Sequence, residues 1–402
     1  MKNLVVRHNP WWKGEKDYHF AKWEGMRIKW VPNWIKDISL KSFSLNFVIG
    51  PRQIGKTTGL KLMVDDLLKK VEAERIFYFN CDLSPDAYSL RKVMDAYLEF
   101  RKSLGQDSSF IFLDEVTGVK GWWRVIKGYV DLGVFKDDVL TITGSSSLKL
   151  RGEVEFFPGR RGLGREVTVY PLSFREFLEV HGVKVKTTGD ANKDAKKAAV
   201  QEEEIKRAFG DYLKKGGFPL SINGDPRADE DFIRAFEGEI LRLGRSVSLS
   251  REVLSSIFKK APSPLGYTTI SKDTSGYSYK TVAEYLELLK SLLILDLARC
   301  KNGEKILHRK EKKVFFIDPF MARSLSFWSG QEFLKGALYE WVVQSHLSRK
   351  FGEVFYFRNS YEIDCMAADL KIEVKAGKPH RKYPKSVEVL DEDTLPLFLA
   401  VI

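Results

Sequence analysis

Gly50-Pro-Arg-Gln-Ile-Gly-Lys-Thr57 is the stretch of this chain that decides its fold. It matches the pattern G-x-x-x-x-G-K-[ST] in full, between an apolar run at 45–49 that indicates a strand and a helical pattern at 58–70. In such a loop, backbone N–H groups wrap a phosphate chain, while the lysine and threonine meet the terminal phosphates and Mg²⁺. The sequence therefore predicts a site for ATP and Mg²⁺, with an ordinary glycine-rich turn as the alternative. The expected contact residues are Gly50, Pro51, Arg52, Gln53, Ile54, Gly55, Lys56, Thr57 and Thr58.

A second motif extends the first. Phe110-Ile-Phe-Leu-Asp114-Glu115 is an apolar run that ends in two acids, the pattern of a central parallel strand whose carboxyl end meets the phosphate loop. We expect Asp114 to hold Mg²⁺ together with Thr57, and Glu115 to orient the attacking water beside Lys56. Binding alone needs only the first acid, so the pair indicates an ATPase.

Length and composition set the remaining limits. A single core rarely grows past about 250 to 300 residues, so a chain of 402 residues should form roughly two to four domains. The 66 Lys and Arg against 54 Asp and Glu favour a polyanionic partner such as nucleic acid. Three widely spaced cysteines argue against a disulfide framework or a zinc ribbon. No apolar run reaches the roughly 18 to 20 residues that span a bilayer, and no signal peptide begins the chain. We expect a cytoplasmic protein with no membrane partner.

The first 175 residues divide into two parts. Residues 41–175 alternate between apolar strands and helical patterns, which predicts a parallel sheet covered by helices, the core of a P-loop ATPase. Residues 1–40 form a basic segment rich in tryptophan. Its rings either pack across the core or stack on a base, and packing is the commoner use of such side chains.

Two further sites in the core are candidates for contact with the γ-phosphate. Ser145 lies in a run of small hydroxyl residues after the fourth strand, where it either senses the phosphate or belongs to a turn and helix cap. Arg160 and Arg161 follow in a glycine-flanked loop. An arginine reaching the nucleotide of a neighbouring copy would stabilise the transition state, which implies a homo-oligomer, and a solvated basic loop is the alternative.

The order of these motifs carries a family resemblance. Together with Tyr170-Pro-Leu-Ser-Phe-Arg-Glu-Phe177 and Gly216-Gly-Phe-Pro219, they resemble the archaeal and bacterial AAA+-type ATPases that have a C-terminal domain of unknown function. The resemblance covers nearly the whole chain, and its most family-specific part is the 170–177 stretch. It implies a P-loop core of five parallel strands, a helical lid, a winged helix and a nuclease-like tail.

Helical patterns dominate the region after the core. We expect the lid at 176–245 and the winged helix at 246–318, where three helical patterns precede two strands that flank a basic loop. The third helix and the loop suit contact with duplex or branched DNA, whereas a purely structural or protein-binding module is the alternative. The side chains expected at phosphates or base edges are Ser278, Tyr279, Lys280, Thr281, Lys301, Lys305, Arg309 and Lys310.

The tail at 319–402 holds another set of charged residues. Glu340 lies in a helical pattern, Asp364 in a strand, and Glu373 and Lys375 two positions apart on the next strand, where they share one face. These four resemble the catalytic residues of PD-(D/E)xK nucleases, including resolvases of four-way junctions. Asp364 and Glu373 would bind Mg²⁺ for phosphodiester cleavage, and Lys375 would position water.

The sequence thus predicts an α/β protein: an AAA+-like parallel sheet with a helical lid, then a winged helix and a small α/β nuclease-like domain. The function that fits is ATP hydrolysis in association with DNA, with metal-dependent cleavage by the tail. The alternative is a nucleotide-driven switch whose winged helix and tail bind proteins or DNA and cut nothing.

Overall fold

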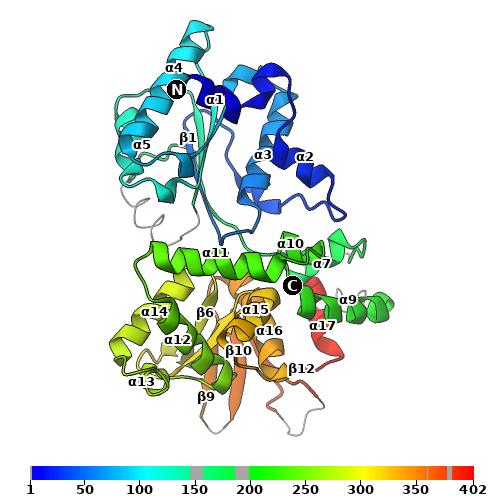
Figure 1. Ribbon diagram of the computed structural model, residues 1–402. Coiled ribbons are helices and arrows are strands. Elements are labelled where there is room, and N and C mark those ends of the chain that lie inside the picture. Colours follow the sequence, from blue (N-terminus) through cyan, green and yellow to red (C-terminus); the bar gives the residue numbers. More distant parts are fainter. Residues whose placement is uncertain (1, 145–156, 186–198, 360, 378–382) are drawn as a thin grey trace. The chain divides into compact units, whose positions relative to one another are not determined.

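The computed structural model describes residues 2–144, 157–185, 199–359, 361–377 and 383–402. The chain forms two compact units, Met1–Tyr170 and Pro171–Ile402 (Figure 1).

The first unit is built on a five-stranded parallel sheet in the order β2-β3-β4-β1-β5. Every residue of β1 and β4 is buried, because helices leave neither face of these central strands open to water. The strands are β1 (Ser44–Ile49), β2 (Ile76–Asn80), β3 (Phe110–Asp114), β4 (Val139–Gly144) and β5 (Glu166–Thr168). The helices that follow β1, β2 and β3 are α3 (Lys56–Leu68), α4 (Ala87–Ser103) and α5 (Trp122–Asp131). The α/β prediction is confirmed.

The tryptophan-rich segment packs on this sheet. It contains the helices α1 (Lys2–His8) and α2 (Tyr18–Glu24) with short 3₁₀ turns around them. Trp11 is buried and donates its indole N–H to the carbonyl of Ile76, while Trp12 stacks on Phe77 and Tyr97. These rings follow the packing alternative, because their faces and N–H groups are engaged by the edge strand β2 and by α4.

Trp34 explains one glycine of α3. A Cβ atom at Gly59 would come within 2.2 Å of the Trp34 ring, so only glycine lets the helix approach it. Trp34 itself is buried, and its contact fastens the segment to the helix that follows the phosphate loop.

The second unit surrounds a seven-stranded sheet in the order β12-β11-β10-β9-β6-β7, with β8 paired to β6. Its strands are β6 (Leu295–Asn302), β7 (Lys305–Ile306), β8 (Lys312–Phe316), β9 (Phe355–Arg358), β10 (Glu362–Ala367), β11 (Leu370–Val374) and β12 (Glu388–Leu390). The parallel pairing of Arg299 with Phe355 and of Cys300 with Tyr356 joins β6 to β9. Strands of the region predicted as a winged helix therefore share one sheet with strands of the region predicted as nuclease-like.

Helices precede and interrupt this sheet in the chain. They are α7 (Phe174–Val180), α9 (Glu202–Lys215), α10 (Pro219–Ile222), α11 (Ala228–Arg242), α12 (Val247–Lys260), α13 (Tyr267–Ser271), α14 (Tyr279–Ser291), α15 (Pro319–Ser329), α16 (Lys335–Phe351) and α17 (Thr394–Val401). Gly216 and Gly217, the first residues of the 216–219 motif, directly follow α9. Within the described residues, no helix combines the length and the apolar character that crossing a bilayer requires.

The 170–177 stretch has a structural reason for its pattern. Ser173 and Glu176 form a capping box at the start of α7, in which each side chain accepts the other residue's backbone N–H. The next N–H, that of Phe174, donates to Nε2 of His346 on α16 at 2.8 Å. Burial lowers the pKa of His346 to about 3, so its ring stays neutral and can accept this bond. The stretch thus fixes α7 to the core of the second unit.

Candidate nucleotide site and carboxylate cluster

The phosphate loop joins the buried end of β1 to the first turn of α3. Gly55 stands at φ 91°, in the left-handed region that glycine enters without strain, and Gln53 shares that region at φ 62°. Lys56 and Thr57 are the first two residues of the helix. Their backbone N–H groups therefore belong to a helix N-terminus, the end that attracts anions.

Lys56 is held at the loop by oxygen atoms. Its Nζ donates to the carbonyls of Gly50 and Pro51 at 3.0 Å each and lies 3.5 Å from Oε1 of Glu115. The lysine is only 4% exposed. A buried ammonium in contact with two carbonyls can exchange them for phosphate oxygens, which bind it more strongly because they carry charge.

Asp114 collects three hydroxyl groups at the end of β3. Thr57 Oγ1 donates to Oδ2 at 2.6 Å, Tyr78 donates to the same oxygen at 2.8 Å, and Thr143 donates to Oδ1. The carboxylate is 1% exposed, so these donors replace the water it has lost. Thr57 and Asp114 lie together as the sequence predicts, and a hydroxyl with a carboxylate are ligands that suit Mg²⁺.

Glu115 adopts an uncommon backbone conformation. Its φ is 54°, a left-handed value that costs a non-glycine residue about 1 to 3 kcal/mol and that tends to occur at functional sites. The backbone N–H of Glu115 donates to Thr143 Oγ1 at 3.0 Å, so one threonine holds both acids of the motif. This turn brings the Glu115 carboxylate to the Lys56 ammonium.

Two of the predicted tail residues, Glu340 and Asp364, contact a lysine that the sequence reasoning missed. Lys313 of β8 places Nζ 2.7 Å from Asp364 Oδ1, 2.9 Å from Glu340 Oε1 and 3.0 Å from Glu362 Oε1. We call Glu340, Glu362, Asp364 and Lys313 the carboxylate cluster. Burial, with Asp364 nearby, raises the pKa of Glu340 well above its usual range.

Glu373 and Lys375 lie next to this cluster and pair with each other. Lys375 Nζ is 2.6 Å from Glu373 Oε1, which also accepts the hydroxyl of Tyr383 at 3.1 Å. Burial and Asp364 raise the pKa of Glu373. Its second oxygen, Oε2, is buried without a hydrogen-bond partner. Among the residues that the structure describes, no group of three or more His, Cys, Asp or Glu side chains could hold a metal ion.

Residues 42–178 match the family described as AAA domain, and this range includes the phosphate loop, Asp114 and Glu115. Most of the matched range lies in the first unit, which ends at Tyr170. A second match, to a domain of unknown function, covers residues 206–332, from α9 to α15. The recognised P-loop family is therefore confirmed, while the nature of the second unit stays open.

Two relatives share much of the chain's length. The uncharacterized protein MJ1637 of Methanocaldococcus jannaschii is 28% identical over 343 residues, which cover 78% of this chain and 67% of the relative. An uncharacterized protein of Haemophilus influenzae is 24% identical over 298 residues, which cover 69% and 68%. Both alignments extend well beyond the AAA domain, so part of the second unit is shared with these relatives.

Similar solved structures include Orc1 of Aeropyrum pernix in complex with DNA, with a TM-score of 0.33, 14% identity and coverage of 71% of this chain and 86% of that one. A single-residue variant of RuvB from Thermotoga maritima gives a TM-score of 0.32, 15% identity and coverage of 66% and 84%. These scores are too low to support an argument. The AAA assignment rests on the family match and on the loop itself.

Three further residues of the AAA domain were predicted to contact the γ-phosphate. One of them, Ser145, falls outside the described residues. Arg160 forms an ion pair with Asp131, and Arg161 places Nη1 3.4 Å from Oε2 of Glu166. Both arginines thus have partners within the first unit, and a role toward a neighbouring copy stays a prediction.

Tyr78 and Lys61 lie beside the candidate site although the sequence reasoning gave them no role, and Thr143, the first residue of the hydroxyl run that includes Ser145, holds Asp114. Tyr78 and Thr143 are polar residues near the carboxyl ends of apolar strands. This position is the feature of the sequence that could have identified them. Lys61 of α3 lies 3.1 Å from the centre of the Tyr78 ring and 3.0 Å from Asp17 Oδ2. Burial lowers the pKa of Lys61 to about 8. Asp17, which caps α2, is thus linked through Lys61 and Tyr78 to Asp114.

Tyr78→Phe should raise the Mg²⁺ concentration needed for half-maximal phosphate release. The hydroxyl fixes Asp114 Oδ2, and the loss of one hydrogen bond of about 1 kcal/mol corresponds to roughly a fivefold change. The measurement is a Mg²⁺ titration at saturating ATP. Tyr88→Phe, an exposed tyrosine of α4, serves as the control. An unchanged Mg²⁺ requirement in Tyr78→Phe would remove Tyr78 from the positioning of Asp114.

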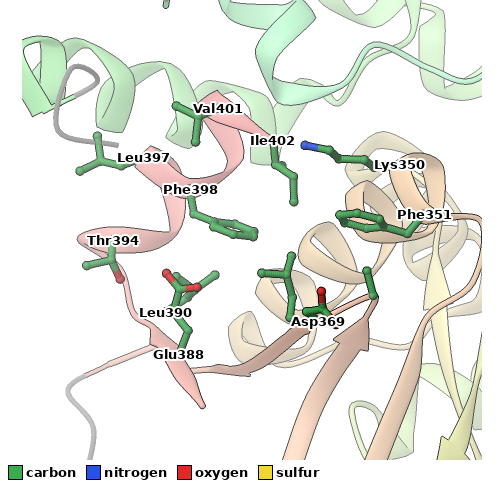
Figure 2. A pocket seen from close by; sticks show the side chains of 12 residues that line it. Lys350, Phe351, Asp369, Glu388, Leu390, Thr394, Leu397, Phe398, Val401 and Ile402 are labelled. Carbon is green, nitrogen blue, oxygen red and sulfur yellow. The ribbon is translucent and has the colours of Figure 1, made fainter. Parts of the chain in front are cut away.

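A separate apolar cavity of about 450 Å³ lies in the second unit, where α16 ends against β11, β12 and α17. Phe351 and Phe398 point into it, and Leu390 lines it (Figure 2). Its charged lining residues are Lys350, Asp369 and Glu388. We assign no chemistry to this cavity.

Proposed function

We propose that the protein binds ATP with Mg²⁺ in its AAA domain and hydrolyses it. The observation that carries this proposal is the contact of Thr57 with Asp114 beside the Lys56 and Glu115 pair. A hydroxyl and a carboxylate are what a protein usually contributes to Mg²⁺, which takes its other ligands from phosphates and water. A lysine and a second acid are the groups that phosphoryl transfer to water requires.

In this proposal each residue has a separate task. Loop N–H groups and Lys56 bind the β- and γ-phosphates, and Lys56 exchanges the carbonyls of Gly50 and Pro51 for phosphate oxygens. Thr57 and Asp114 hold Mg²⁺, which when bound neutralises charge on the phosphates. Glu115 orients the attacking water and accepts its proton on the carboxylate.

We further propose that the second unit contacts DNA through a winged helix. The order α12, α13, α14, then β6, β7 and β8 supports it, as does a short backbone pairing of Leu265 with Lys312 beside β8. The β6–β7 hairpin and the loop after it present Lys305, Arg309 and Lys310 as exposed cations, and Lys301 is half-buried. Such a surface meets phosphates without reading sequence.

For the tail, we propose the alternative hypothesis from the sequence, in which it binds proteins or DNA and does not cleave DNA. The cleavage hypothesis needs Asp364 and Glu373 to hold a metal beside Glu340 and Lys375. The position of Lys313 inside the same carboxylates favours the binding hypothesis. The protein would then act as a nucleotide-driven switch on DNA.

The experiment that tests the proposed function measures phosphate release by the full chain with Mg²⁺ or with a chelator, in the presence and absence of duplex and four-way DNA. We expect release to require Mg²⁺, and DNA affinity to fall steeply as salt rises because counterions are released on binding. ATP binding without release under every condition would contradict hydrolysis. Affinity that does not change with salt would contradict a phosphate-binding surface.

A further inference from the structure

We propose that Lys313 is a built-in cation of the carboxylate cluster and that the cluster therefore takes no divalent metal. The metal that the nuclease resemblance implies does not fit the residues present. The proposal concerns the tail alone, so it stands or falls independently of the nucleotide site.

Lys313 is surrounded by carboxylates: it donates hydrogen bonds to Glu340 and Asp364 and forms an ion pair with Glu362. An ammonium group has three protons to donate, and Nζ has three carboxylates within 3.0 Å, from α16 and from β10. The side chain of Lys313 is 2% exposed, against 5% for Glu340 and 8% for Asp364. A cation that is buried and satisfied in this way stays in place, because withdrawing it would leave carboxylates buried without a counter-charge.

Three carboxylate oxygens of Asp364 and Glu340 already accept hydrogen bonds. Asp364 gives Oδ1 to Lys313 and accepts the backbone N–H of Val374 on Oδ2 at 2.9 Å. Glu340 Oε1 accepts both Lys313 and the side-chain amide of Gln344. Mg²⁺ demands near-octahedral oxygen ligands at about 2.0–2.1 Å, and a fixed ammonium between Asp364, an expected ligand, and Glu340 beside it occupies that space with like charge.

Glu373 does not restore the site. One of its oxygens is paired with Lys375 and Tyr383, which leaves only the buried Oε2 without a partner. A single open carboxylate oxygen is fewer than a divalent cation requires. The absence of any metal-binding group of three acidic, His or Cys side chains within the described part of the chain agrees with this.

Lys313 also has a positive role, which is to join two regions of the chain. It lies on β8, which pairs with β6 of the basic hairpin, whereas Glu340 and Asp364 come from α16 and β10 of the tail. Because it is buried at the point where these elements meet, the ion-pair network holds the hairpin strands and the tail as one body. Glu340 and Asp364 thus serve as ion-pair partners of a lysine and not as metal ligands.

The test measures how many Mn²⁺ ions bind to the full chain in the absence of nucleotide. The free ion is measured by electron paramagnetic resonance, and the bound ion is the difference from the total. We expect wild type and Asp364→Asn to bind the same amount. Lys313→Ala should gain one Mn²⁺ per chain, because alanine removes the positive charge and leaves its space vacant. Adding Asp364→Asn to Lys313→Ala should abolish this gain. Lys313→Met fills the space and should gain none. The control is Lys312→Ala, which changes the neighbouring lysine over the Tyr267 ring and should bind as much Mn²⁺ as wild type.

A wild-type Mn²⁺ site that is lost in Asp364→Asn or in Glu373→Gln would overturn the proposal, and this comparison does not need a Lys313 variant to fold. A folded Lys313→Ala protein that gains no Mn²⁺ would also contradict it. The same preparations are incubated with linear, forked and four-way DNA in Mg²⁺ or Mn²⁺. We expect no cleavage by wild type, and cleavage that Asp364→Asn abolishes would refute the inference.

Discussion

Glu115→Gln is expected to keep the wild-type affinity for ATP and to release phosphate about 10² to 10⁴ times more slowly, the usual effect of losing a positioned general base. The amide keeps the shape of the side chain on its left-handed backbone but cannot take a proton from water. The measurements are steady-state phosphate release and equilibrium binding of a fluorescent ATP analogue. The pair of assays separates binding from turnover.

Two variants complete that experiment. Lys56→Ala should weaken binding itself, because the ammonium contacts the phosphates in the bound state as well as in the transition state. Glu99→Gln changes an exposed glutamate of α4 and should match wild type in both assays. Wild-type turnover in Glu115→Gln would remove Glu115 from its proposed role.

Charge reversal of the basic hairpin should produce the second large effect. Replacing Lys301, Lys305 and Arg309 together by Glu is expected to weaken DNA binding about 10- to 100-fold near 0.1 M salt. It should also reduce the slope of log affinity against log salt by about 0.9 for each phosphate that the variant no longer neutralises. The measurement is fluorescence anisotropy with duplex and four-way DNA across a salt series.

A matched triple variant controls for net charge. Lys92, Lys102 and Lys136 are exposed lysines of the first unit, and their reversal changes total charge by a similar amount without touching the hairpin. It should weaken binding far less. If the hairpin variant binds as tightly as wild type at every salt concentration, the region proposed as a winged helix is a structural or protein-binding module.

The nucleotide site could be predicted because its signals are local in sequence. The phosphate loop, with Lys56 and Thr57, is one uninterrupted motif, and Asp114 follows directly on an apolar run. The parallel order of strands then brings the carboxyl ends of β1 and β3 to one edge of the sheet, so the meeting of Thr57 with Asp114 follows from topology.

The role of Lys313 could not be predicted in the same way. It is one of two adjacent lysines at the start of a strand, and its partners Glu340 and Asp364 are 27 and 51 residues away. Alternation along a strand indicates that one of the pair faces inward but not what it meets there. The pairing of β6 with β9 is equally remote, because no local pattern specifies which strands of two regions become neighbours.

The link from Asp17 through Lys61 and Tyr78 to Asp114 crosses the start of the matched family range at residue 42. The first forty residues therefore support the edge strand β2 from outside the matched family range, and they are connected by contacts to the acid that we propose as a magnesium ligand. A relative that lacks such a segment must shield β2 and neutralise the lysine at the position of Lys61 by other means. Loss of this segment would expose the rings at β2 and remove Asp17, the carboxylate that pairs with Lys61.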